Sequence, residues 1–421
     1  MSESTKITTL DNGLRVATEE MPNVKTASVG IWVDVGARYE LPEVNGVAHM
    51  LEHMAFKGTE RRSARAIAEA IEDVGGHLNA YTSREHTAYY ARVLADDLPL
   101  AVDLLADILQ HSTFVEDELT RERQVILQEI GQVQDTPDDL VFDLFQETAY
   151  PGQALGRSIL GPAEIVAAMP RQALLDYMVG HYGPRCMVLA AAGRLEHDHV
   201  VDLAQRLFFE LPAPAPHAPD PAQYRGGERR EMRDLEQAHV LLGMPAFSYL
   251  DDDFYALQVL STMLGGGMSS RLFQEVREKR GLAYSVFSFA SCYRDAGMLG
   301  IYAGTGEQET HELVPVVCEE FQKLIDEPGE GELVRARAQL KTSLMMALES
   351  CFAQSEELAR QLLIFNRRIA PEEIIARIDA VDQAAIRRVG RRLLTGAGPT
   401  LAAIGPLARL PSLDAVRARL S

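Results

Sequence analysis

The stretch His49-Met50-Leu51-Glu52-His53 decides which fold and chemistry to expect of this chain. In a helix, two histidines four residues apart project from the same face, so both imidazoles can reach one metal ion. Glu52 lies beside them, where it can take a proton from a water molecule that the metal acidifies. The order H-x-x-E-H is the inverse of the zinc motif H-E-x-x-H. The stretch therefore predicts a zinc-dependent hydrolase.

The flanking sequence favours a helix around this motif. Residues 44–56 contain no proline, no glycine after Gly46, and an apolar stripe formed by Val47, Met50, Leu51 and Met54. A short match of this kind also arises by chance, in a helix whose two histidines have ordinary core or surface roles. The motif is therefore a strong indication of zinc but needs further ligands to support it.

A catalytic zinc site needs a third protein ligand and keeps its fourth position open. Residues 116–134 are typical of a long helix with an apolar side, and they carry Glu118, Glu122 and Glu129. Glu122 and Glu129 lie two turns apart on one face, so one could bind the metal while the other holds a ligating histidine. The alternative is an ordinary solvated acidic face. The spacing alone does not decide between these.

Three segments together resemble the pitrilysin/insulinase family of metallopeptidases: HMLEHMAFKGT (49–59), GGHLNAYTSREHTAYYARV (75–93) and ERQVILQEI (122–130). Within that family the likeness is to the β-subunit type of mitochondrial processing peptidase and its bacterial relatives, and it extends over most of the chain. The resemblance implies one zinc ion per chain, held by His49, His53 and Glu129. It also implies that Glu52 is the general base and that Glu122 has a supporting role.

The second half of the chain contains no H-x-x-E-H, so the metal is expected in the first half. Its most informative stretch is SSRLFQEVREKRGLAYSV (269–286). The resemblance implies that Arg277 holds the substrate backbone and that Tyr284 helps to stabilise the oxyanion, roles that suit a guanidinium and a phenol. Without the resemblance they would be interpreted as an ordinary surface charge and a strand residue.

The resemblance also implies a set of substrate-binding residues. A peptide substrate should lie extended along a sheet edge, and residues 76–82 are similar to the family's edge strand, so Asn79 and Ala80 are candidates. Phe56 matches an aromatic residue that lines the pocket just after the scissile bond. Asp139 and Asp143 match acidic positions that receive a substrate arginine, and two carboxylates can clamp one guanidinium. We therefore expect unstructured, basic, arginine-containing peptides as substrates.

The length of 421 residues suggests two domains. A proline-rich stretch over 211–221 precedes Gly226-Gly227, so we expect a zinc-binding domain over 1–211, a linker over 212–231 and a related domain over 232–421. Both halves show the same order of strand, helix, helix and paired strands. The second helices are expected over 63–74, with Ser63 as a typical N-cap, and over 270–279. This order predicts an α+β fold in which each domain is a mostly antiparallel sheet packed with helices.

Composition narrows the class of protein. Hydrophobic residues make up 47%, which is typical of a globular chain. The net charge of −20 disfavours nucleic acid and favours a basic ligand, although solubility alone also explains it. We expect no membrane span, because no apolar run is long enough. The absence of a signal-peptide pattern and the scattered four cysteines favour a cytoplasmic protein over one of the mitochondrial matrix.

Members of this family either join four such domains in one chain or assemble two chains of this size. The resemblance therefore implies a homodimer in which Arg277 and Tyr284 of one subunit complete the zinc site of the other, with a heterodimer containing an α-like subunit as the alternative. Two other functions stay open: a noncatalytic structural core-type subunit, and a peptide-binding module that keeps zinc for stability. The complete set of ligands and base favours an active endopeptidase.

Overall fold

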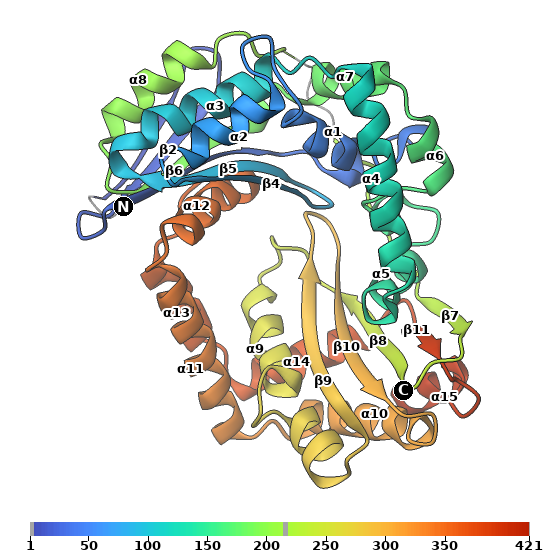
Figure 1. Cartoon of the computed structure of the whole chain (residues 1–421). Coiled ribbons are helices and arrows are strands. Elements are labelled where there is room, and N and C mark those ends of the chain that lie inside the picture. Colours follow the sequence, from blue (N-terminus) through green and yellow to red (C-terminus); the bar gives the residue numbers. More distant parts are fainter. Residues whose placement is uncertain (1–3, 214–217, 421) are drawn as a thin grey trace. The chain divides into compact units, whose positions relative to one another are not determined.

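Two β-sheets organise the chain, one in each of two units (Figure 1). The computed structural model describes residues 4–213 and 218–420. The described residues of the first unit fall in the ranges Met1–Gly131, Ser158–Asp220 and Met345–Ala370, and those of the second in Gln132–Arg157, Pro221–Leu344 and Pro371–Ser421. Each unit combines one mostly antiparallel sheet with helices, which confirms the predicted α+β fold.

The first sheet has the strand order β1-β2-β6-β3-β5-β4. All neighbouring pairs are antiparallel except β2 and β6, which are parallel. The strands are β1 (Thr5–Thr9), β2 (Arg15–Glu20), β3 (Thr26–Val33), β4 (His77–Thr82), β5 (Thr87–Leu94) and β6 (Met187–Gly193). β4 therefore forms one edge of this sheet and is paired on one side only.

Helices cover both faces of the first sheet (Figure 1). Most of them share one large apolar core with one face of the sheet. The helices of this part of the chain are α1 (Val47–Ala55), α2 (Ala64–Glu72), α3 (Leu98–Gln110), α4 (Glu116–Gln134), α6 (Ala163–Ala168), α7 (Arg171–His181) and α8 (His197–Leu207). The opposite face packs against α12 (Cys351–Phe365), whose Leu358 and Leu362 lie in one cluster with the buried Trp32.

The second sheet has the order β7-β11-β8-β10-β9, with β7 and β11 parallel and the other pairs antiparallel. The strands are β7 (Gly227–Met232), β8 (Ala238–Ala246), β9 (Ala283–Cys292), β10 (Gly297–Thr305) and β11 (Thr400–Gly405). One face shares an apolar core with most of the unit's helices. The helices are α9 (Phe254–Gly265), α10 (Thr310–Asp326), α11 (Glu330–Ala347), α13 (Pro371–Asp379), α14 (Gln383–Leu393) and α15 (Leu413–Leu420). The opposite face packs against α5 (Pro137–Ala149).

The two units do not follow the expected boundaries of 1–211 and 232–421. α5 comes from the first half of the sequence but packs on the second sheet, and α12 comes from the second half but packs on the first. Each sheet has a second apolar face that must be buried. α12 packs on this face of the first sheet, and α5 packs on this face of the second. The expected linker also differs, because β7 occupies its last residues. Residues 214–217 of that linker lie outside the described residues.

Local predictions around the motif agree with the structure. The helix expected over 44–56 forms as α1, and the helix expected after Ser63 forms as α2, with the Ser63 hydroxyl accepting a hydrogen bond from the Ala66 N–H. The long helix predicted over 116–134 has the bounds of α4. Within residues 4–213 and 218–420, no helix is both long and apolar enough to cross a bilayer.

Candidate metal centre

Helix α1 is anchored at its start by Glu40. The buried Glu40 carboxylate accepts hydrogen bonds from the backbone N–H groups of Gly46 and Ala48, both at 2.8 Å. Gly46 has φ 98°, a left-handed conformation that favours glycine. A carboxylate at this end also interacts favourably with the helix dipole. These contacts fix the direction in which α1 presents His49 and His53.

Three side chains from α1 and α4 converge at one point. The Nε2 atoms of His49 and His53 each lie 3.7 Å from Oε2 of Glu129, and one potential ligand atom from each residue lies within 4.8 Å of the others. The imidazole rings have centroids 4.6 Å apart. Both histidine side chains are largely buried, while Glu129 is 38% exposed. The structure thus brings together the three residues predicted to bind the metal.

The donor set suits zinc. Two imidazole nitrogens and one carboxylate form a known catalytic zinc set that leaves a fourth position for water or substrate. Zinc bonds of about 2.0–2.1 Å in a tetrahedron separate ligand atoms by about 3.3 Å, and the two 3.7 Å distances to Glu129 are close to this value. Burial, and then the neighbouring His53, lowers the pKa of His49 to about 4. His49 is therefore neutral at neutral pH, as a metal ligand must be.

Glu122 lies behind the metal-binding face rather than on it. Its Oε2 is 3.0 Å from Nδ1 of His53, and its Oε1 is 2.7 Å from Nζ of Lys57. The Glu122 side chain is only 7% exposed. By accepting a hydrogen bond from the Nδ1–H group, a carboxylate in this position leaves Nε2 of His53 free for a metal.

Glu52 lies on α1 between the two histidines but is not one of the three convergent residues. Burial raises the pKa of the Glu52 carboxyl, and a hydrogen bond with Thr82 of β4 opposes this rise only in part. A raised pKa makes a carboxylate a stronger base. The position and environment of Glu52 therefore suit proton transfer beside a metal.

The substrate-binding candidates of the first unit lie around α1. Asn79 and Ala80 belong to the edge strand β4, which is tied to α1 through the Thr82 hydroxyl and the Ala48 carbonyl at 3.5 Å. Asn79 is exposed and Ala80 is buried. Phe56 ends α1, and its ring centroid lies 6.4 Å from that of Tyr89. An edge strand beside the candidate metal ligands is where an extended peptide could add a strand.

Arg277 and Tyr284 lie together in the second unit. The Arg277 guanidinium is 4.9 Å from the ring centroid of Tyr284 and 4.7 Å from that of Phe273. Arg277 lies in the π-helix η6 (Phe273–Lys279), and Tyr284, 78% exposed, falls at a bulge where the register of β9 and β10 shifts. π-helices and bulges are rare irregularities that occur often at functional sites.

Asp139 and Asp143 also belong to the second unit, one turn apart on α5. Asp139 is exposed and Asp143 is half-buried. Between them, Phe142 stacks on Tyr302 with ring centroids 5.6 Å apart. Burial, together with the charges of Asp138 and Asp139, raises the pKa of Tyr302 to about 12. The structure places this acidic and aromatic group on the second sheet's side of α5.

The sequence alone did not predict three residues of the centre: Glu40, Lys57 and Thr82. Lys57 belongs to the motif segment. Its position four residues after His53 was the one feature of the sequence from which its place in the centre could have been predicted. Glu40 contacts the start of α1 because of the path of the short loop between them, and Thr82 contacts α1 through a tertiary hydrogen bond. No periodic spacing in the sequence indicates either contact.

Comparison with known proteins agrees with this geometry. Residues 15–163 match the family described as Insulinase (Peptidase family M16), and residues 168–340 match the Peptidase M16 inactive domain. The chain is 42% identical, over 99% of its length and 81% of the relative's, to a probable mitochondrial-processing peptidase subunit beta of Arabidopsis thaliana. This chain belongs to the M16 insulinase family.

Bacterial relatives of the same family show similar identity. An uncharacterized zinc protease of Streptomyces coelicolor is 42% identical, over 95% of this chain and 89% of the relative. Among solved structures, a protease from Helicobacter pylori has a TM-score of 0.88 at 24% identity, covering 96% of this chain and 99% of that chain. The structural likeness supports the M16 two-domain fold, and the sequence relatives support a peptidase.

Proposed function

We propose that this chain is a zinc-dependent endopeptidase that cuts unstructured, basic peptides. The observation that carries the proposal is the convergence of His49, His53 and Glu129, with Glu52 beside them. His49, His53 and Glu129 hold one zinc ion, and Glu122 orients His53 through its Nδ1. When bound, zinc supplies a Lewis acid that polarises the scissile carbonyl and acidifies water.

Glu52 acts as the general base in this proposal. Its carboxylate accepts the proton of the attacking water and then returns it to the nitrogen of the leaving amine. Burial favours this cycle, because a raised pKa makes the carboxylate a stronger base toward water and keeps the proton on Glu52 until the leaving amine takes it. Arg277 and Tyr284 hold the substrate backbone and stabilise the oxyanion.

The proposed substrate is an extended peptide that contains arginine. Main-chain hydrogen bonds to the edge strand at Asn79 and Ala80 bind any sequence in extended form. Phe56 provides an apolar surface for the residue after the cut. Asp139 and Asp143 bind the arginine, and the net charge of −20 favours basic peptides in general.

Cleavage of a defined peptide tests this function. The full chain, loaded with zinc, is incubated with an unstructured arginine-containing peptide, and the products are identified by mass spectrometry. We expect internal cleavage at a bond that has an arginine two residues before the cut. A matched peptide with glutamine in place of that arginine should be cut about 10- to 150-fold more slowly, since hydrogen bonds to charged groups contribute about 1.5–3 kcal/mol. Failure to cut any unstructured peptide internally would contradict the proposal.

We further propose that the working form is a homodimer in which Arg277 and Tyr284 of one subunit complete the zinc site of the other. A heterodimer with an α-like chain would use the same zinc site of this chain. The reason to expect a second subunit is that the family which this chain resembles assembles two chains of this size. This chain carries both the zinc-site residues and the pair Arg277 and Tyr284.

Mixing two inactive variants tests the shared site. Glu52→Gln and Tyr284→Phe should each be slow alone, but a mixed dimer contains one site with both groups intact. With free subunit exchange at equal amounts, half of the dimers are mixed, so about a quarter of wild-type cleavage should return. Activity no higher than the average of the two separate variants would contradict the shared site.

A further inference from the structure

Lys57 lies just beyond α1 and is linked to a candidate zinc ligand through one carboxylate. Its Nζ is 2.7 Å from Oε1 of Glu122, whose Oε2 is 3.0 Å from Nδ1 of His53. We propose that Lys57 is a positioning residue of the metal centre: it holds Glu122 in the orientation in which Glu122 fixes His53. This inference rests on the proposed zinc site.

The charge of Glu122 explains why Lys57 matters. Glu122 is largely buried, and a buried carboxylate needs a compensating positive charge. His53 cannot supply that charge while it binds a metal, because a ligating imidazole is neutral. Among the described residues, the ion pairs of Glu122 are with His53 and Lys57. Of the two side chains paired with Glu122, Lys57 is therefore the one that keeps its positive charge when the metal is bound.

The chain around Lys57 is held firmly by the end of α3. The carbonyl of Gly58 accepts a hydrogen bond from the Thr113 N–H at 3.1 Å, and the Glu60 N–H donates to the His111 carbonyl at 3.0 Å. These contacts restrict the backbone on the carboxyl side of Lys57. The Lys57 N–H itself donates to the Met54 carbonyl of α1 at 3.2 Å, which ties the loop to the helix.

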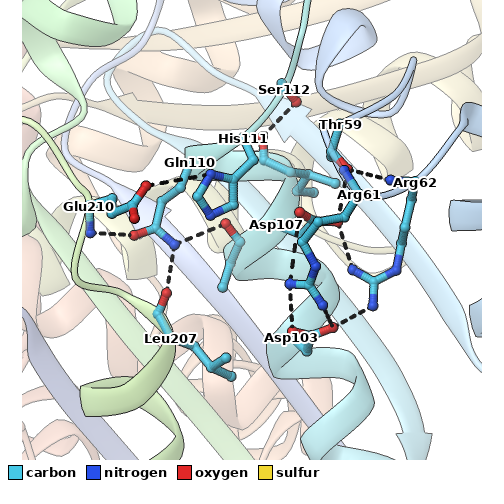
Figure 2. A network of polar contacts seen from close by, with 12 residues as sticks. Thr59, Arg61, Arg62, Asp103, Asp107, Gln110, His111, Ser112, Leu207 and Glu210 are labelled. Carbon is cyan, nitrogen blue, oxygen red and sulfur yellow. Dashed lines mark hydrogen bonds and ion pairs between the residues drawn. The ribbon is translucent and has the colours of Figure 1, made fainter.

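A polar network strengthens this attachment (Figure 2). The Asp107 carboxylate, fully buried on α3, accepts hydrogen bonds from the Thr59 hydroxyl at 2.9 Å and from Arg62 at 2.6 Å. Arg61 pairs with Asp103, one turn earlier on α3, at 3.0 Å. The loop after α1 is thus fixed on α3, and Lys57 is presented to Glu122 from a rigid backbone.

His53 is the ligand on which this positioning acts. Its Nδ1 has Glu122 as a partner, whereas Nδ1 of His49 is buried without a hydrogen-bond partner among the described residues. An acceptor behind a ligating histidine fixes its tautomer and ring orientation, and loss of such a group typically costs about 10–100-fold in metal affinity or activity. Lys57 does not contact His53 in this way but acts on Glu122, the acceptor of the His53 hydrogen bond.

Zinc affinity of the full-length metal-free protein tests the inference, measured by competition with a chromogenic chelator. Lys57→Met, which removes the charge but keeps the length, should bind zinc about tenfold more weakly, at the lower end of the range for such outer groups. Lys57→Arg should recover most of this loss. The matched control is Arg65→Met, which removes an exposed cation paired with Glu69 on α2, outside the network that holds Lys57, and should bind zinc like wild type.

A double-mutant cycle separates positioning from a general structural role. In the Glu122→Gln background the carboxylate that Lys57 holds is gone, so Lys57→Met should weaken zinc binding no further. An equal loss in both backgrounds, or wild-type affinity in Lys57→Met alone, would overturn the inference while leaving the zinc site intact. If the wild-type chain binds no zinc, the proposed function fails with it.

Discussion

Glu52→Gln should leave zinc binding intact and reduce peptide cleavage by about 10²–10⁴-fold, the usual contribution of a general base. Glutamine has the shape of glutamate but cannot accept the proton of the attacking water. Glu52 is not one of the three convergent ligands, so the metal content should stay at one zinc per chain. Cleavage rate and metal content, measured on the same preparation, check both halves of the prediction.

A matched control for this variant is Glu60→Gln. Glu60 is an exposed glutamate in the loop after α1, so its substitution removes the same charge at a distance from the reacting atoms. It should cleave at the wild-type rate. If Glu52→Gln also cleaves at that rate, Glu52 is not the base. If it loses zinc in proportion to activity, Glu52 supports the metal instead.

The helices around the motif could be predicted well because their signals are local. α4 carries an unbroken helical pattern from Glu116 to Gln134, and the structure has the same bounds. Ser63 is a typical N-cap residue, and it caps α2. Repeated strand and helix patterns in both halves also sufficed for the α+β prediction, since the strands of each half form one sheet.

The exchange of α5 and α12 between the two units could not be predicted. An apolar stripe shows that a helix will be buried on one side, but it does not identify the sheet that receives it. α12 follows α11 in the second half and still packs on the first sheet, against Trp32. Domain boundaries drawn from a proline-rich stretch therefore followed the order of the chain rather than its packing.

In the candidate site, too, the local pattern could be predicted from the sequence and the supporting contacts could not. The spacing of His49, Glu52 and His53 placed them on one helix, and the resemblance selected Glu129 over Glu122. The contacts behind them depend on the path of a loop, as for the hydrogen bonds of Glu40 to the start of α1, or on tertiary packing, as for Glu122 and His53. A periodic pattern in the sequence does not indicate such supporting hydrogen bonds.

Local irregularities in the backbone could not be predicted from the sequence either. Residues 270–279 were expected to form an ordinary helix, but Phe273–Lys279 is a π-helix. The bulge at Tyr284 likewise arises from the pairing of β9 with β10. Both features depend on how the second sheet packs, and both lie at the residues that the resemblance assigned to the active site.

Removal of the metal should abolish cleavage. A site with two histidines and one carboxylate prefers zinc over magnesium or calcium, which favour oxygen ligands. Without the metal, no group at His49, His53 and Glu129 can polarise the scissile carbonyl. The protein treated with a chelator should therefore lose peptide cleavage, and neither magnesium nor calcium should restore it.

Titration of the metal-free protein with zinc, with cleavage of an arginine-containing peptide as the readout, tests the central claim most directly. The rate should rise in proportion to added zinc and stop rising at one equivalent per chain, where the site of His49, His53 and Glu129 is full. Cleavage that persists in the metal-free protein, or that does not respond to zinc at any ratio, would contradict the claim that this chain is a zinc endopeptidase.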